Sequence, residues 1–153
     1  MLRKKTSLLI LVFLLAILGG CASQEADYFF LDWKFYLGDA PEAMENDFDD
    51  SQWQAVAIPH DWSIEQSYTT ENTAASTGFL PGGLGWYRKS FTLDEDPEGK
   101  HIRVEFDGIY NNSTVWINGH KLGSRPYGYS SFSYDLSKYL LPAGQENVLA
   151  VRV

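Results

Sequence analysis

The sequence predicts an all-β domain, built as an antiparallel β-sandwich of the jelly-roll type. Apolar and polar residues alternate with a period of two in many short segments, which is typical of strands with one buried face. The pair Asn118-Gly119 separates two such segments and predicts a tight hairpin. No apolar repeat of 3.6 residues is long enough for a packed helix. Short strands with closely spaced turn signals therefore favour a sandwich.

The first predicted strand covers residues 29–37, where apolar residues occupy alternate positions with Asp32 and Lys34 between them. The same alternation predicts five further strands, at residues 56–58, 87–93, 102–106, 132–136 and 149–153. The last of these ends within its own pattern, so we expect the domain to be truncated at its C-terminal end and to continue beyond Val153.

The predicted hairpin adds two strands, at residues 115–117 and 120–122. Both central residues of a type I′ turn need a positive φ, which Asn and Gly adopt readily. Single helical turns are expected only around residues 49–53 and 137–141. Two long connections, residues 38–47 and 62–84, join the strands, and loops as long as the second are usually functional or mobile.

Aromatic residues are the first candidates for ligand contact, because flat rings stack on the apolar faces of sugars. Trp33 and Trp116 lie within predicted strands and are assigned to the core. Trp62 opens the longer connection, and both packing and sugar stacking remain open for it. The segment 125–132 is a second polar and aromatic loop, in which Arg125, Tyr127 and Tyr129 either brace the hairpin or contact a ligand.

The N-terminus has the order of a secretory signal, which is basic, then apolar, then small. Three basic residues precede the eleven apolar residues 8–18, too few to span a bilayer, and Leu18-Gly19-Gly20-Cys21 resembles a bacterial lipobox. We therefore predict a lipoprotein signal peptide at residues 1–20, an acylated Cys21, a tether at residues 21–27 and a folded domain at residues 28–153. The expected product is exported and membrane-anchored, in the periplasm or at the cell surface. The alternative is an ordinary cleavage site near Cys21.

Charge and length exclude several classes of protein. Twelve basic and twenty acidic residues give a net charge of −8, whereas a nucleic-acid binder needs a basic surface that displaces counterions from phosphates. Neutral partners such as sugars remain compatible with this charge. The 153 residues are also too few for a (β/α)₈ barrel, which needs roughly 250.

Three kinds of chemistry can be set aside from the residue pattern. His60, His101 and His120 share no metal-ligand spacing, and Cys21 is the only cysteine, so we expect no metal and no other cofactor. A hydrolytic triad of His60, Asp61 and Ser63 is not expected, because neighbours in an extended segment point to alternating sides. The glycines at 83 and 85 precede a predicted strand rather than a helix, so they favour a close-packed turn over a phosphate loop.

Six segments in order resemble the N-terminal sugar-binding domain of glycoside hydrolase family 2, in its bacterial β-galactosidase branch. The match covers about residues 28–153 and includes Pro59-His60-Asp61-Trp62 and Gly85-Trp86-Tyr87-Arg88. The other segments are residues 48–53, 106–110, 115–119 and 147–153. The family domain is a jelly-roll sandwich similar to galactose-binding domains, in agreement with the strand pattern.

The resemblance implies a retaining exo-glycosidase whose immunoglobulin-like and barrel domains are absent from these residues. In the family both catalytic glutamates belong to the barrel, so no catalytic residue is assigned here. The resemblance places His60, Asp61 and Trp62 at the rim of a pocket for a β-galactoside-like glycan. Two other classes remain open: a free-standing carbohydrate-binding surface lipoprotein, which needs an exposed aromatic platform, and a structural surface sandwich without a ligand.

Overall fold

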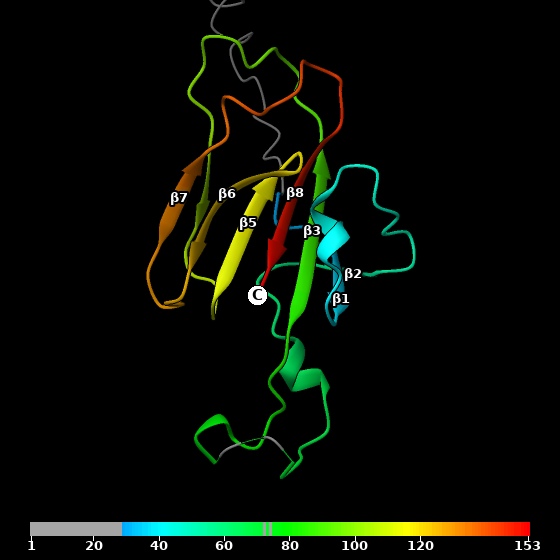
Figure 1. Ribbon diagram of the computed structural model, residues 1–153, viewed down its shortest axis with the longest axis vertical. Helices are drawn as coiled ribbons and strands as arrows, with labels where there is room; N and C mark the ends of the chain where they lie inside the picture. The colour runs from blue at the N-terminus through cyan, green and yellow to red at the C-terminus, as the bar shows by residue number, and fades with distance from the viewer. Residues whose placement is uncertain (1–28, 72, 74) are drawn as a thin grey trace, which may run out of the picture.

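The computed structural model describes residues 29–71, 73 and 75–153, and they form two layers of antiparallel strands (Figure 1). The first layer is a six-stranded sheet in the order β2-β1-β3-β8-β5-β6, and the second is the pair β4-β7. The strand bounds are β1 Trp33–Leu37, β2 Gln54–Val56, β3 Gly85–Phe91, β4 Arg103–Phe106, β5 Ser113–Ile117, β6 His120–Arg125, β7 Phe132–Asp135 and β8 Asn147–Arg152. The predicted all-β sandwich is confirmed.

Each of the eight predicted strands has a counterpart, although several ends differ. The first strand begins at Trp33 rather than at Phe29, because Asp32 has a φ of 56°, which interrupts the extended backbone. The hairpin turn is confirmed, since Asn118 and Gly119 have φ values of 49° and 77°. Its strand β6 extends to Arg125, beyond the predicted end, and a bulge between Val115 and Trp116 shifts the register.

The main core lies between the two layers. Its side chains come from the inner face of the large sheet and from the smaller layer above it. The fully or nearly fully buried members are Trp33, Val104, Val115, Ile117, Leu136, Leu149 and Val151. Burying each such side chain contributes about 1.5–3 kcal/mol, so this cluster is the main source of stability.

The outer face of the large sheet is covered by the connection of residues 38–53. This connection contains the 3₁₀ helix η1 (Pro41–Met44), whose Ala43 is fully buried against Trp86 and Ala150. Trp116 also lies on this face, where its ring stacks on Trp86 at 5.2 Å. The assignment of Trp116 to the core is confirmed for this second apolar cluster, because the two-residue period directs its neighbours Val115 and Ile117 to the main core and Trp116 to the outer face.

Arg88 fastens the connection 38–53 to the sheet. Its side chain is 2% exposed, and Nε donates to the Asp50 carboxylate at 2.7 Å. One terminal nitrogen donates to the backbone carbonyls of Ala43 and of Glu45, the latter at 2.9 Å. A buried guanidinium needs such hydrogen-bond partners. The path of the connection 38–53 therefore depends on Arg88, and the burial of Arg88 depends on the connection.

The described residues contain no α-helix, but they contain 3₁₀ turns that the sequence did not predict. Besides η1, these are η2 (Trp62–Glu65) and η3 (Ala75–Thr77), both within the longer connection. No helix in the described part of the chain combines the length and the apolar composition needed to cross a membrane. The predicted signal peptide, Cys21 and the tether lie outside the described residues.

Candidate functional site

The three predicted rim residues, His60, Asp61 and Trp62, follow β2 and lead into the longer connection. We call residues 62–71, 73 and 75–84 the arm, because they extend beyond one end of the sandwich (Figure 1). The arm carries exposed apolar side chains, with Ile64 68% and Tyr68 76% exposed.

His60 is the most buried of the three, with a side chain only 10% exposed. Its ring packs edge-on against Phe35 at 4.8 Å, and Nδ1 lies 2.9 Å from the Tyr87 hydroxyl. Nε2 lies 3.5 Å from a Glu65 carboxylate oxygen. When the imidazole carries its proton on Nε2, Nδ1 accepts from the Tyr87 hydroxyl and the proton faces Glu65. His60 thus joins the sheet to η2.

Tyr87 is a partner of His60 that sequence reasoning did not predict. It lies on β3, within the Gly-Trp-Tyr-Arg segment that carried the family resemblance. Burial is the main cause that raises the pKa of Tyr87 above its ordinary value, and the carboxylates of Asp61 and Glu65 raise it further. The phenol therefore stays neutral at physiological pH and can donate to His60.

Asp61 caps the turn that follows it. One carboxylate oxygen accepts from the Ser63 backbone N–H at 3.0 Å and from the Ser63 hydroxyl at 2.6 Å. The sequence argument assumed an extended segment here, and that assumption is wrong, because Asp61 is the N-cap of a 3₁₀ turn. His60 does not join this pair; it turns to Tyr87 instead.

Trp62 packs across the base of the arm and is half-buried. A Cβ added at Gly83 would lie 3.3 Å from the indole ring, so the ring and the backbone of Gly83 are in close contact. Gly85 likewise leaves room for Phe35, whose ring would lie 2.8 Å from an added Cβ. The predicted close-packed entry into the strand is confirmed. Trp62 thereby holds the two ends of the arm together.

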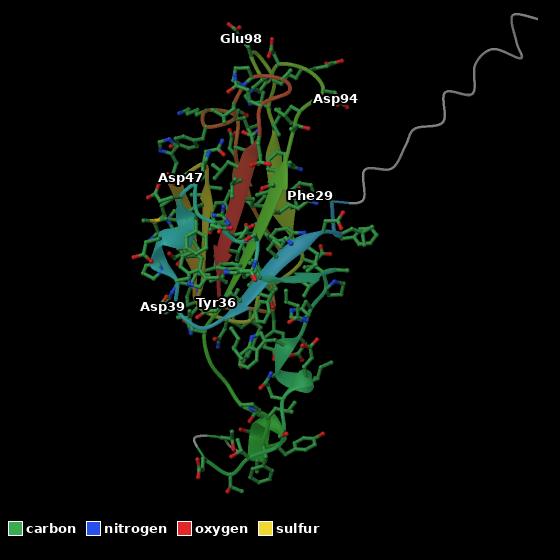
Figure 2. All side chains as sticks on the ribbon, turned by 90° about the vertical axis from the view of Figure 1, so that its right-hand side faces the viewer. Phe29, Tyr36, Asp39, Asp47, Asp94 and Glu98 are labelled. Carbon is green, nitrogen blue, oxygen red and sulfur yellow. The ribbon has the colours of Figure 1, made fainter. Side chains whose placement is uncertain are left out.

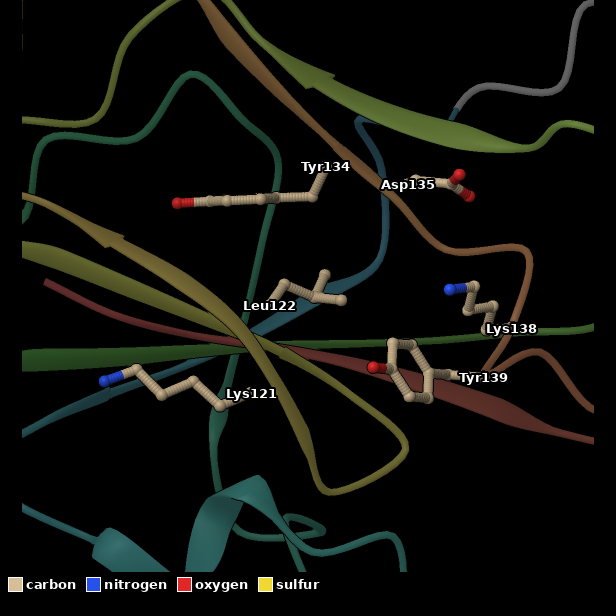
Figure 3. Close-up of a pocket in the computed structure, with 6 residues that line it drawn as sticks. All are labelled: Lys121, Leu122, Tyr134, Asp135, Lys138 and Tyr139. Atoms are coloured by element: carbon tan, nitrogen blue, oxygen red, sulfur yellow. The ribbon is translucent and has the colours of Figure 1, made fainter.

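A separate hollow of about 240 Å³ lies between β6 and the segment that follows β7 (Figure 3). It is lined by Lys121, Leu122, Tyr134, Asp135, Lys138 and Tyr139. Hydrogen bonds from Ser137, and secondarily the charges of His101 and Lys138, lower the pKa of Asp135. None of the predicted rim residues lines this hollow. In the part of the chain that the structure describes, no three His, Cys, Asp or Glu side chains gather as a metal site.

The fold is that of a β-sandwich module of the kind that accompanies glycosidases. Residues 31–153 match the model of the family "Glycosyl hydrolases family 2, sugar binding domain". The chain belongs to this family, as the resemblance predicted.

Named relatives support the assignment. A β-galactosidase of Bacteroides ovatus, BoGH2A, is 50% identical over 143 residues, which are 89% of this chain and 17% of that protein. A β-galactosidase of Thermoanaerobacter pseudethanolicus is 31% identical over 126 residues, which are 82% of this chain and 16% of that protein. The chain corresponds to the non-catalytic N-terminal domain of such glycoside hydrolases and spans about a sixth of their length.

Solved structures share the fold. A β-glycosidase from Bacteroides vulgatus aligns with a TM-score of 0.77 and 50% identity, covering 82% of this chain and 16% of that one. A β-glucuronidase from Bacteroides uniformis aligns with a TM-score of 0.70 and 31% identity, covering 82% of this chain and 14% of that one.

Proposed function

We propose that the chain is the sugar-binding module of a retaining exo-glycosidase of the β-galactosidase type, which hydrolyses O-glycosidic bonds of β-galactoside-like glycans. The observation that carries the proposal is the membership of residues 31–153 in the sugar-binding family, together with the two β-galactosidase relatives. The catalytic carboxyl pair, which in retaining enzymes is about 5–5.5 Å apart, comes from a barrel domain of the parent protein.

Within this proposal, the rim segment serves the pocket in two ways. Trp62 presents its exposed edge to the sugar while its ring packs against the base of the arm. Asp61 offers its second carboxylate oxygen, since the first is held by Ser63. The ring of His60 contacts Tyr87 and Glu65. These three residues act as positioning residues, because they hold the rim segment against β3.

The test compares Trp62→Ala, Trp62→Phe and Ile64→Ala in the parent enzyme. Loss of a rim contact worth about 1–3 kcal/mol lowers kcat/KM for 4-nitrophenyl β-D-galactopyranoside roughly ten- to a hundredfold. Trp62→Phe retains part of the wild-type kcat/KM. Ile64→Ala leaves kcat/KM unchanged, because the Ile64 side chain is 68% exposed on the same turn.

Wild-type kcat/KM in Trp62→Ala together with a lower Tm would leave Trp62 a purely structural role. A parent that cleaves 4-nitrophenyl β-D-glucuronide and not the galactoside would overturn the galactosidase assignment.

We also propose that the mature protein is a membrane-anchored lipoprotein with acyl chains on Cys21. The support is the order of basic, apolar and small residues before Cys21. Because one acyl chain anchors only weakly, multiple acylation of Cys21 would be needed for stable attachment.

A further inference from the structure

Three tyrosines stand out on the surface at one corner of the sandwich. Tyr110, in the loop between β4 and β5, is 64% exposed, and Tyr127 and Tyr129, in the loop between β6 and β7, are 62% and 76% exposed. Their rings form a cluster, with centroids 5.1 Å apart for Tyr110 and Tyr129 and 5.9 Å apart for Tyr127 and Tyr129. We call these three residues the tyrosine surface.

The two loops that carry the tyrosine surface are tightly packed on each other. A Cβ at Gly108 would lie 2.6 Å from the Gly128 carbonyl oxygen, and a Cβ at Gly128 would lie 2.6 Å from the Tyr110 Cα. The Asn112 N–H also donates to the Pro126 carbonyl across the loops at 3.3 Å. The rings are therefore presented by a preorganised backbone, which lowers the entropy cost of binding.

The tyrosine surface lies at the end of the sandwich where β8 finishes. Thr114 of β5 pairs with Arg152, and the adjoining Ser113 pairs with Arg125, directly before the second loop. Any polypeptide that continues from Val153 therefore starts beside these loops. The opposite end is acidic and faces water, as Asp94 and Glu98 show in Figure 2.

We propose that the tyrosine surface is the face on which the remainder of the parent glycosidase docks, an inference that rests on the proposed function. The glycosidase relatives are long enough to supply this occupant, since the chain covers only 16–17% of the two β-galactosidases. Tyr and Arg are among the residues enriched at protein interfaces, and the exposed Arg125, two residues before Tyr127 in the chain, ends the strand that leads into the second loop.

Ring geometry favours a protein over a glycan as the occupant. The planes of the paired rings meet at 51° and 65°, so the three rings offer no common flat face for stacking a row of sugar units. Angled rings instead leave gaps that side chains of a docking domain can fill.

The experiment is nitration of the protein expressed from the complete coding sequence with tetranitromethane, followed residue by residue by mass spectrometry. Tyr139 is the internal reference, because it is only 37% exposed and lies on the segment after β7, away from the two loops. A docked surface makes the three tyrosines react about tenfold more slowly than Tyr139, which corresponds to roughly 1.4 kcal/mol of opening free energy. In guanidinium chloride all four tyrosines then react at similar rates.

Faster nitration of the three tyrosines than of Tyr139 overturns the proposal. This holds equally if the complete coding sequence ends at Val153, because no further domain would then cover the surface. Protection that disappears on dilution assigns the surface to a second copy, and protection that appears only with added galacto-oligosaccharide assigns it to a glycan; both outcomes overturn the proposal.

A second measurement uses the double variant Tyr127→Ser with Tyr129→Ser, and Tyr139→Ser as control. Loss of docking lowers the Tm of the parent by about 2–4 °C, and the control does not. Nitration rates and the Tm do not depend on turnover. Failure of the glycosidase assignment would appear in kcat/KM instead, so the two failures can be told apart.

Discussion

Arg88 is the residue that does most to hold the connection 38–53 on the outer face of the large sheet. It is a cation in the middle of strand β3. Its guanidinium is buried and meets the Asp50 carboxylate and backbone carbonyls of the connection 38–53. A buried charge in this position is tolerated only because each nitrogen of the guanidinium donates to an oxygen acceptor. Arg88 therefore sets the path of a loop that has little regular structure.

Replacing Arg88 by Met should destabilise the fold by about 3–5 kcal/mol, because it leaves the buried acceptors of the connection without a donor. Urea unfolding followed by tryptophan fluorescence measures the change. The matched control is Arg103→Met, since Arg103 is 68% exposed and pairs at the surface with Glu105. Its effect should stay below about 1 kcal/mol. Equal effects of the two variants would contradict the anchoring role of Arg88.

Tyr87 gives the fold a dependence on alkaline pH. Its pKa is raised in the folded state, so the unfolded chain loses the phenol proton first. The stabilisation is complete below about pH 10, the ordinary phenol pKa, and is lost as the pH rises above it. Urea midpoints should fall as the pH rises above about 10, more steeply for wild type than for Tyr87→Phe. Parallel pH profiles of the two proteins would refute this linkage.

At the scale of elements, the period of two indicates six of the strands, and the Asn118-Gly119 pair adds the hairpin turn and its two strands. The period cannot locate η1, η2 and η3, because 3₁₀ turns of three or four residues leave no periodic trace. Alternation tells which residues share a face, but it does not tell that a loop covers the second face, where Trp116 packs. The Asp61 cap could have been read from the sequence, because Asp two residues before Ser63 is a common turn motif.

The β5–β6 hairpin is tied to β8 by a pair of asparagine side chains. Asn147 is fully buried, and its amide oxygen accepts from the Asn118 side chain and from the Leu141 N–H, both at 2.8 Å. Asn147→Ala should cost about 1–3 kcal/mol by leaving these donors unpaired, as measured by denaturant unfolding. Asn46→Ala, which removes only an exposed 3.3 Å contact to Asn118, is the control and should change stability little. A neutral Asn147→Ala would mean that water replaces its bonds.

At the scale of the whole molecule, the sequence could predict the sandwich and the family, whereas the assignment of His60, Asp61 and Trp62 to a pocket rim stays a prediction. The motif that contains these residues selects the segment but not the direction of its side chains. It could not tell that His60 points into the sandwich, because its partner Tyr87 is 27 residues away in the sequence and reaches it only through the β1–β3 pairing. The packing of the loop 107–112 on the loop 126–131 is also a tertiary contact between segments distant in the sequence, so the sequence pattern could not predict it.

Cys21 determines where the whole molecule resides, if the lipoprotein proposal holds. Cys21→Ser should move the protein from the membrane fraction to a soluble or unprocessed form, because the thiol is the attachment atom for the acyl chain. Membrane fractionation with radiolabelled palmitate measures this, and Ser23→Ala is the neighbouring control that should remain at the membrane. Continued incorporation of palmitate into Cys21→Ser, with unchanged partition, would disprove acylation at this thiol.

The strand order of the large sheet also bears on aggregation in solution. Its edges are β2, which is only three residues long, and β6, which carries the exposed cations Lys121 and Arg125. A short edge and a charged edge, the latter twisted by the bulge opposite it, are poor templates for another strand. The edges of the large sheet are therefore poor sites for fibril growth.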